Sequence, residues 1–158
     1  MPVLALLALS LATPARVVAA DGHWAALQRD GRCEAVVAAL APALKDGPQA
    51  RVSIAFDVAP RGRNGEVAAQ LSRAPRGDST VMLTIGETPF LLTARGDMAW
   101  SSGPAQEAAI LSAMRGGGSM RIEARSAGGG RIVDRYLLDG APTAIDAAAA
   151  CAARLHNR

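Results

Sequence analysis

Residues 119–138, SMRIEARSAGGGRIVDRYLL, show most clearly how this chain folds. In the first half, Met120, Ile122 and Ala124 alternate with charged residues, which is typical of a β-strand with one side in water. Three consecutive glycines supply a turn, and Arg131–Leu138 returns as a second strand. The stretch therefore predicts a hairpin of two antiparallel strands.

Short apolar segments separated by turns continue toward the N-terminus. Residues 51–58 alternate well, because Val52, Ile54 and Phe56 lie in one phase and Ser53 and Asp57 in the other. We expect further strands over residues 23–27, 33–40, 66–71, 80–85, 89–94 and 98–100. The alanine-rich segment 33–40 fits a turn or two of helix equally well.

Helical patterns occur in two places. The first helical pattern covers residues 105–115, with Pro104 at its start and three glycines after its end. A second helix is expected from Asp139-Gly140 to about Leu155. About nine short strands and two helices make the predicted fold class mainly β, an antiparallel β-sandwich or open barrel with two helices packed on it.

The composition indicates a small aliphatic protein of one domain. The chain has 158 residues, of which 50% are hydrophobic, 3% aromatic and 20% charged, with a formal net charge of +3. A nucleic-acid surface needs clustered cations and stacking aromatics, whereas the aromatic residues are scattered and no two arginines are adjacent. We therefore expect no nucleic-acid partner.

The N-terminus resembles an export signal. An apolar run from Val3 to Ala12 is too short to span a bilayer, and the small residues Val18-Ala19-Ala20 precede Asp21. We expect residues 1–20 to be a signal peptide, residues 21–158 to form a single β-rich domain, and the product to be periplasmic or secreted. The alternative is a buried N-terminal helix or strand. No later segment is apolar for long enough to span a membrane as a helix.

Cys33 and Cys151 are the only two cysteines. An even number of cysteines in an exported protein indicates a disulfide, which would here close a loop of 118 residues. Such a loop is worth about 4–5 kcal/mol in the chain-entropy model. A free buried thiol pair and a redox-active couple are the alternatives, although no Cys-x-x-Cys motif supports redox chemistry.

The residues for catalysis or metal binding are sparse. Gly77-Asp78-Ser79 invites comparison with the nucleophile motifs of hydrolases, which need a histidine base near the serine. The only histidines are His23 and His156, near the two ends of the expected domain. Nothing in the sequence supports a catalytic dyad of Ser79 with Lys45. The same two histidines show no zinc-ligand spacing. The glycine triplets lack phosphate-loop spacing. We expect no enzyme activity, no metal and no cofactor.

Two further features have ordinary structural explanations. Asp134 shares a strand phase with apolar residues, so we expect it to be partly buried in an ion pair with Arg121 or Arg125. Arg-Gly-Asp occurs at residues 76–78 and 95–97. Exposed, this tripeptide can engage host-cell receptors, but Gly-Asp is also common in turns.

Several short motifs, taken in order, resemble the invasion-associated locus B family. Trp24 precedes Cys33, and the C-terminal half contains these elements of the pattern in sequence: Asp97-Met98-Ala99-Trp100, Ala113–Gly117, Met120–Ser126, Asp134-x-Tyr136-Leu137-Leu138-x-Gly140, Ile145 and Cys151. The family consists of small exported alphaproteobacterial proteins with a β-rich fold, and some are associated with entry into host cells. The resemblance implies that Trp24, Trp100, Met114 and Tyr136 are structural, with Trp100 and Met114 anchoring a helix on the sheet.

These observations favour an exported, non-enzymatic protein of the bacterial envelope that binds a protein or another envelope component, with host-cell contact as a further role that the resemblance implies. The alternative is a small periplasmic ligand-binding or inhibitor domain. A pocket of several hundred Å³ with convergent polar groups would favour the ligand-binding domain. A flat apolar patch above about 400 Å² would favour a protein partner.

Overall fold

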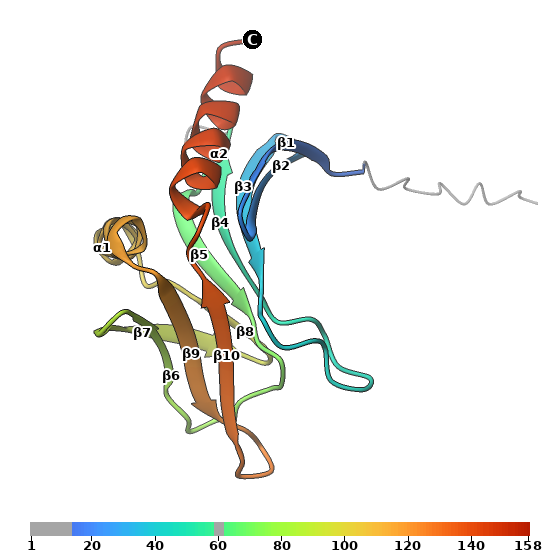
Figure 1. Cartoon of the computed structure of the whole chain (residues 1–158), viewed down its shortest axis with the longest axis vertical. Coiled ribbons are helices and arrows are strands. Elements are labelled where there is room, and N and C mark those ends of the chain that lie inside the picture. The colour runs from blue at the N-terminus through green and yellow to red at the C-terminus, as the bar shows by residue number, and fades with distance from the viewer. Residues whose placement is uncertain (1–13, 59–61) are drawn as a thin grey trace, which may run out of the picture.

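The computed structural model describes residues 14–58 and 62–158, which form ten strands and two helices (Figure 1). The strands are β1 (Arg16–Asp21), β2 (Trp24–Arg29), β3 (Arg32–Ala38), β4 (Arg51–Asp57), β5 (Asn64–Gln70), β6 (Val81–Ile85), β7 (Thr88–Arg95), β8 (Met98–Trp100), β9 (Ser119–Arg125) and β10 (Arg131–Leu137). The helices are α1 (Pro104–Gly116) and α2 (Ala141–His156).

All ten strands belong to one antiparallel sheet in the order β1-β2-β3-β4-β5-β8-β7-β6-β9-β10. The long strand β7 joins its two halves: Thr88–Leu92 pair with β6, and Thr93–Arg95 pair with β8. Because one strand serves both halves, the sheet bends there and the halves stand at an angle (Figure 1). The sheet does not close, so the open antiparallel form of the predicted fold class is confirmed.

The hairpin of residues 119–138 is present as β9 and β10. Ile122 pairs with Asp134 and Met120 with Tyr136, and the expected apolar phase faces the core. The nine predicted strands and both helices all occur, with ends shifted by a residue or two. The ambiguous segment 33–40 forms strand β3, because it pairs with β2 and β4 and its alternate residues Cys33, Ala35 and Val37 are buried in the core.

Strand β1 lies inside the predicted signal peptide. Residues 1–13 fall outside the described residues, but Arg16–Asp21 pair with β2, and Val18 and Ala19 are half-buried against the core. The paired strands of the structure thus begin at Arg16, inside the predicted signal peptide. Cleavage after Ala20 stays a prediction, and it would remove all but one residue of β1.

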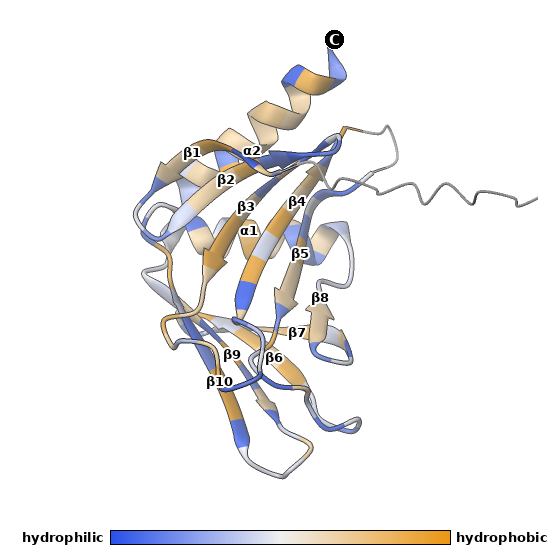
Figure 2. Ribbon diagram, turned by 90° about the vertical axis from the view of Figure 1, so that its right-hand side faces the viewer, coloured by the Kyte–Doolittle hydropathy of each residue, from blue (hydrophilic) through white to orange (hydrophobic). Residues whose placement is uncertain are grey.

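Both helices cover the same face of the sheet (Figure 2). Helix α2 packs across strands β1 to β4, and α1 packs on β5 and the β6–β7 hairpin. Between helices and sheet lies one continuous core of mainly aliphatic side chains and many alanines. Within the described residues, no helix covers the opposite face of strands β2 to β5 and β8.

The predicted disulfide is present. Cys33 on β3 is bonded to Cys151 on α2, with the two Cα atoms 6.0 Å apart. The bond links a central strand to the helix that covers it, so neither the free thiol pair nor an open dithiol describes this structure. The β1–β2 turn also contacts the segment just before α2, because the His23 amide donates a hydrogen bond to the Asp139 carbonyl (3.2 Å).

Candidate functional site

The helix-free face of the sheet is built from the second phase of each strand. Antiparallel register sets Val36, Ser53, Ala68 and Trp100 side by side in one row across β3, β4, β5 and β8. The next rows are Glu34, Ala55 and Glu66 on one side and Ala38, Arg51, Gln70 and Met98 on the other. Because the middle of the face carries only small side chains, the surface is hollow there.

This hollow, which we call the sheet-face groove, has a volume of about 620 Å³. Its lining residues come from β2 to β5, β8 and the segment before β4: Leu27, Arg29, Arg32, Glu34, Val36, Val37, Ala38, Pro48, Gln49, Arg51, Ser53, Ala55, Arg63, Glu66, Ala68, Gln70, Met98 and Trp100. The volume lies within the range of about 300–1,000 Å³ typical of ligand sites.

Glu34 is the most buried charged residue in the groove. The residue is only 8% exposed, and its carboxylate lies 3.7 Å from Arg29 Nε and 3.6 Å from Arg32 Nη2. Within residues 14–58 and 62–158 the carboxylate accepts no hydrogen bond, so its lone pairs remain open toward the groove. Burying a carboxylate without hydrogen bonds is costly, and the two guanidinium groups offset part of that cost.

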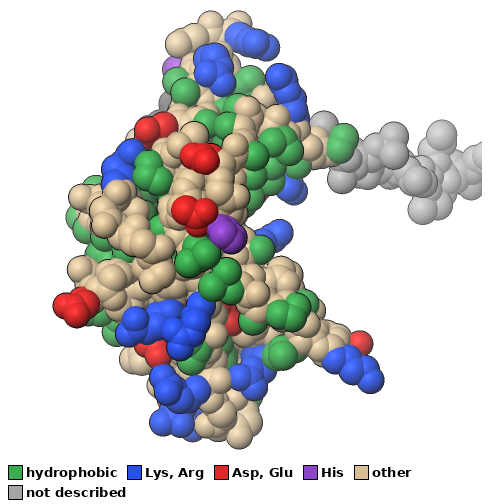
Figure 3. Space-filling view, in the orientation of Figure 1, with side chains coloured by type: hydrophobic (Ala, Val, Ile, Leu, Met, Phe, Trp, Pro, Cys, Tyr) green, Lys and Arg blue, Asp and Glu red, His purple; other side chains and the backbone are tan. Residues whose placement is uncertain are grey.

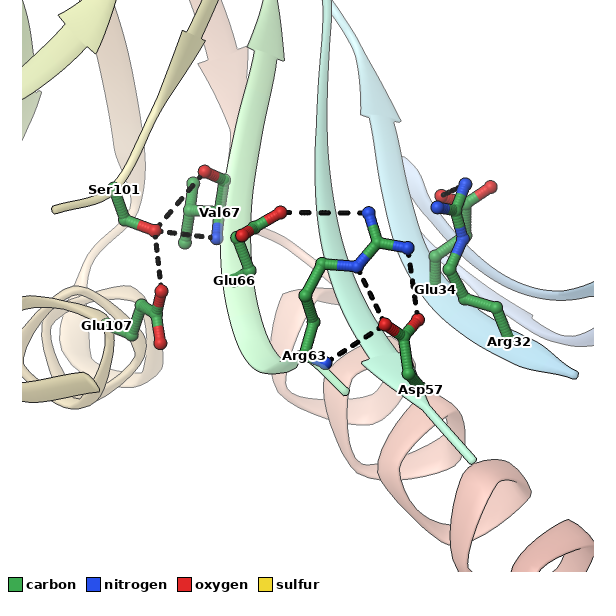
Figure 4. A network of polar contacts seen from close by, with 8 residues as sticks. All are labelled: Arg32, Glu34, Asp57, Arg63, Glu66, Val67, Ser101 and Glu107. Atoms are coloured by element: carbon green, nitrogen blue, oxygen red, sulfur yellow. Dashed lines mark hydrogen bonds and ion pairs between the residues drawn. The ribbon is translucent and has the colours of Figure 1, made fainter. Parts of the chain in front are cut away.

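A tighter ion-pair cluster closes the same end of the groove (Figure 4). Arg63 donates to Asp57 from Nε (2.9 Å) and Nη2 (3.1 Å), and Arg63 Nη1 lies 3.7 Å from Glu66. These hydrogen bonds lower the pKa of Asp57 and raise that of Arg63, with burial opposing both shifts. The cluster joins β4 to β5 and holds its charges in fixed positions.

The other end of the groove carries polar groups without partners. In the described residues, the Arg51 guanidinium and the Ser53 hydroxyl make no hydrogen bond, and Arg51 has no ion pair. Gln70 uses its amide N–H on the Leu71 and Asp97 carbonyls at 3.4 and 3.3 Å, which leaves its amide oxygen free. One unpaired cation, one hydroxyl and one amide oxygen therefore face the same space.

Trp100 forms the apolar wall of the groove beside Met98. The expectation that Trp100 is a core anchor under a helix is not met: it is half-buried, and Ala99 is the residue of β8 that faces the core. In a three-residue strand, a shift of one position changes the face of the sheet. The sequence motif identified Trp100 as a residue of this strand but did not indicate which face of the sheet its side chain lies on.

The other predicted structural residues lie in the core. Met114 is fully buried on α1, and Trp24 is 2% exposed with its indole N–H donating to the Leu137 carbonyl (2.9 Å). Tyr136 is 1% exposed, and its hydroxyl is the only fully buried side-chain polar atom of the described residues without a partner. Burial raises its pKa, and the nearby Asp134 adds to the shift.

Asp134 is buried, as expected, but the predicted ion pair is wrong. Its carboxylate accepts a hydrogen bond from the Ser72 amide (3.0 Å). Arg121 and Arg125 cannot reach it because they lie in the other phase of β9, and Arg121 pairs instead with Glu123 at 3.0 Å. Asp134 pairs with Ile122, so its side chain lies on the same face of the sheet as Ile122, and the side chains of Arg121 and Arg125 lie on the other face.

The residues considered for catalysis lie apart. His23 is hydrogen-bonded to Asp139, and His156 to the Val58 carbonyl. Ser79 donates to the Thr80 carbonyl and accepts from the Arg125 amide, as a strand-entry residue does. No group of three or more His, Cys, Asp or Glu in the described part of the chain could hold a metal ion.

Both Arg-Gly-Asp tripeptides lie in exposed turns, and in the first Arg76 pairs with Asp78 at 2.8 Å. On the face shown in Figure 3, acidic, basic and apolar side chains are interspersed. Across residues 14–58 and 62–158, no helix has the length and hydrophobicity needed to cross a membrane.

The fold is thus that of a β-rich protein with an open antiparallel sheet and two helices on one face. Among solved structures it is similar to the crystal structure of invasion associated protein B from Bartonella henselae, with a TM-score of 0.58 and 13% sequence identity over 92% of this chain and 100% of that one. At this identity the likeness shows the fold alone, and it confirms the resemblance that the sequence motifs indicate. No protein-family model matches the chain, and a search of curated proteins finds no significant match.

Proposed function

We propose that this chain is an exported, non-enzymatic binding protein of the bacterial envelope, and that it binds its ligand in the sheet-face groove. Export is supported by the leader-like N-terminus and by the disulfide, since such bonds persist in oxidising compartments. The similar structure is named for an association with invasion, and this suggests an envelope role.

The observation that carries the proposal is the groove itself. It combines about 620 Å³ of space with polar groups that point into it and have unused hydrogen-bonding capacity. The large exposed apolar residues, by contrast, lie apart on β1, on the segment after β3 and on β7: Val17, Leu40, Leu44 and Leu91. The structure therefore favours the ligand-binding alternative over recognition of a partner through an apolar patch.

The groove also suits binding better than catalysis. Nucleophilic catalysis needs a base within hydrogen-bond reach of the nucleophile. Ser53 is the only hydroxyl group lining the groove, and its side chain has no base as a partner in the described residues. The carboxylates of the groove are instead paired with arginines: Glu34 with Arg29, and Glu66 with Arg63.

Site-specific photocrosslinking in the native host tests this function. A benzophenone amino acid replaces Ala38, an exposed residue at the groove, and in a matched control replaces Ala153, an exposed alanine on α2. We expect an adduct from residue 38 that residue 153 does not give, and we expect the protein in the periplasm or medium. Identical adducts from both positions, no adduct from either, or retention in the cytoplasm would contradict the proposal.

A further inference from the structure

We propose that the ligand of the sheet-face groove is an uncharged saccharide chain, stacked on Trp100 and hydrogen-bonded by the polar side chains of β3 to β5. This inference rests on the proposed function, because it names the chemistry of the ligand for the same site. Four features of the groove carry it.

The first feature is the middle of the groove floor, which offers no free backbone. Strands β3 and β4 are paired on both sides along their length, and β5 is paired with β4 along its length and with β8 over Ala68–Gln70. A peptide usually gains affinity by adding to a free sheet edge through main-chain hydrogen bonds, and the middle of the groove floor, over β3, β4 and Ala68–Gln70 of β5, offers no such edge. Recognition in the groove must therefore come from side chains.

The second feature is the balance of charge. At one end, three arginines face three carboxylates in two sets of ion pairs. Glu34 lies between Arg29 and Arg32, and Arg63 lies between Asp57 and Glu66. A polyanion would be repelled by these carboxylates and a polycation by the guanidinium groups, and like charges in contact cost several kcal/mol at an interface. A ligand without net charge avoids both penalties, and Arg51, the unpaired cation at the other end of the groove, can donate hydrogen bonds to neutral oxygens.

The third feature is the kind of polar group. Carboxylates, guanidinium groups and side-chain amides are planar and can each serve two hydrogen bonds at once. Glu34 and the Gln70 amide oxygen accept, while Arg51 donates. Adjacent hydroxyl groups on a sugar ring both donate and accept, so they match such a mixed set, and the buried, unbonded Glu34 would gain the hydrogen bonds that it lacks.

The fourth feature is the apolar wall. Trp100 is half-buried beside Met98 and lies in one row with the small residues Ser53 and Ala68. A tryptophan face binds flat, weakly polar C–H surfaces well while its edge stays wet. The C–H face of a pyranose ring presents such a surface, and the small residues leave room for the ring beside the indole.

The test is a titration of the purified full domain with defined oligosaccharides, monitored by tryptophan fluorescence and calorimetry. The neutral probes are the tetramers of N-acetylglucosamine, of α-1,4-glucose and of β-1,4-glucose, and the charged comparators are the galacturonic acid tetramer and hexaglutamate. We expect at least one neutral tetramer to bind with a Kd below about 1 mM. The charged comparators should bind more weakly.

Variants then locate the binding site. Trp100→Ala should weaken binding at least about tenfold, and Trp100→Phe, which keeps an aromatic face, should recover most of it. Glu34→Gln removes the groove carboxylate, whereas Glu123→Gln, its matched control, changes a carboxylate on β9 that pairs with Arg121 and Arg131. We expect weaker binding only from Glu34→Gln, with circular dichroism confirming that each variant is folded.

The inference is overturned if no neutral tetramer binds at about 10 mM, or if binding is unchanged in Trp100→Ala. Preferred binding of hexaglutamate would also overturn it and would identify an acidic peptide as the ligand. If residue 38 still crosslinks to a component of the envelope in these cases, the proposed function stands and only the saccharide chemistry fails. If the protein binds a saccharide but stays in the cytoplasm, the saccharide inference stands and the proposed envelope function fails.

Discussion

At the scale of single residues, polar groups in the core and in the groove differ in whether solvent or a ligand can reach them. Glu34 faces the groove, where solvent or a ligand can reach its oxygens, while Tyr136 has a hydroxyl that is fully buried without a partner. An unsatisfied buried polar atom costs about 1–3 kcal/mol. The two residues thus lead to opposite expectations: removing the polar group should weaken binding at Glu34, and at Tyr136 it should cost no stability.

Tyr136→Phe should therefore leave the free energy of unfolding unchanged or raise it by up to about 1 kcal/mol. Urea denaturation measures this, with Tyr136→Ala as the comparison that should lose about 3–5 kcal/mol because it empties a packed site. A loss above about 1 kcal/mol in the Phe variant would mean that the hydroxyl makes a hydrogen bond.

The Asp57–Arg63 pair predicts a dependence of stability on pH. Because the folded state lowers the pKa of Asp57 below its ordinary value of 3.8, its contribution is complete above that value and is lost as the pH falls through the lower folded pKa. The Arg63 side chain is 39% exposed, so solvent screening limits the contribution to about 1 kcal/mol or less.

Urea denaturation of the wild type and of Asp57→Asn between neutral pH and about pH 2 tests this dependence. We expect the wild type to be the more stable at neutral pH and the difference to shrink below pH 3.8, the ordinary pKa of an aspartate side chain. A difference that is constant over the whole range would show that the variant acts through packing and not through the charge of Asp57.

At the scale of elements, strand β1 raises the sharpest question. It lies at the edge of the sheet, contacts α2 and ends at the turn that packs on the start of that helix. An edge strand with two half-buried residues contributes stability through its ladder and its packing. Loss of β1 would also expose the apolar edge of β2 to pairing with other chains.

The fragment 16–158 should therefore be more stable than 21–158 by about 2 kcal/mol or more. Denaturant midpoints of the two fragments measure the difference, and light scattering reports whether 21–158 self-associates. Equal stability of the two fragments would remove the structural objection to cleavage after Ala20. A clear difference would favour a mature N-terminus upstream of Arg16, which N-terminal sequencing of the exported protein can check.

At the scale of the whole molecule, one close contact joins the N-terminal hairpin to the C-terminal helix. Gly140 precedes α2 with φ of +87°, and a methyl group on it would overlap the Asp21 carbonyl. Gly129, in the β9–β10 turn, has nearly the same φ of +88° but open space around it. The two glycines therefore separate backbone strain from the long-range contact.

Gly129→Ala should cost about 1 kcal/mol, from its left-handed backbone alone. Gly140→Ala should cost clearly more, about 3 kcal/mol, because the β1–β2 turn must also move away from α2. Thermal or urea unfolding of both variants measures this. Equal losses would indicate that the hairpin does not need its contact with α2.

Much of the architecture could be predicted because it is encoded locally. Alternation in residues 51–58 and 119–138 predicted both strands and their buried phase, and proline and glycine predicted where the helices begin and end. The disulfide followed from the number of cysteines and the expectation of export. Strand β1 was obscured because a short apolar strand and the end of a signal peptide have the same composition.

The groove and the place of Trp100 depend on tertiary structure. Alternation separates the two faces of each strand, but it does not reveal which face the helices cover, and the residues of the groove come from strands as distant in the chain as β3 and β8. From the sequence alone, every described strand except β1 could be predicted, together with both helices and the cysteine pair, because each depends on near neighbours or on simple counting. Only the packing of α1 and α2 on one face placed Glu34, Arg51 and Trp100 in one groove on the other.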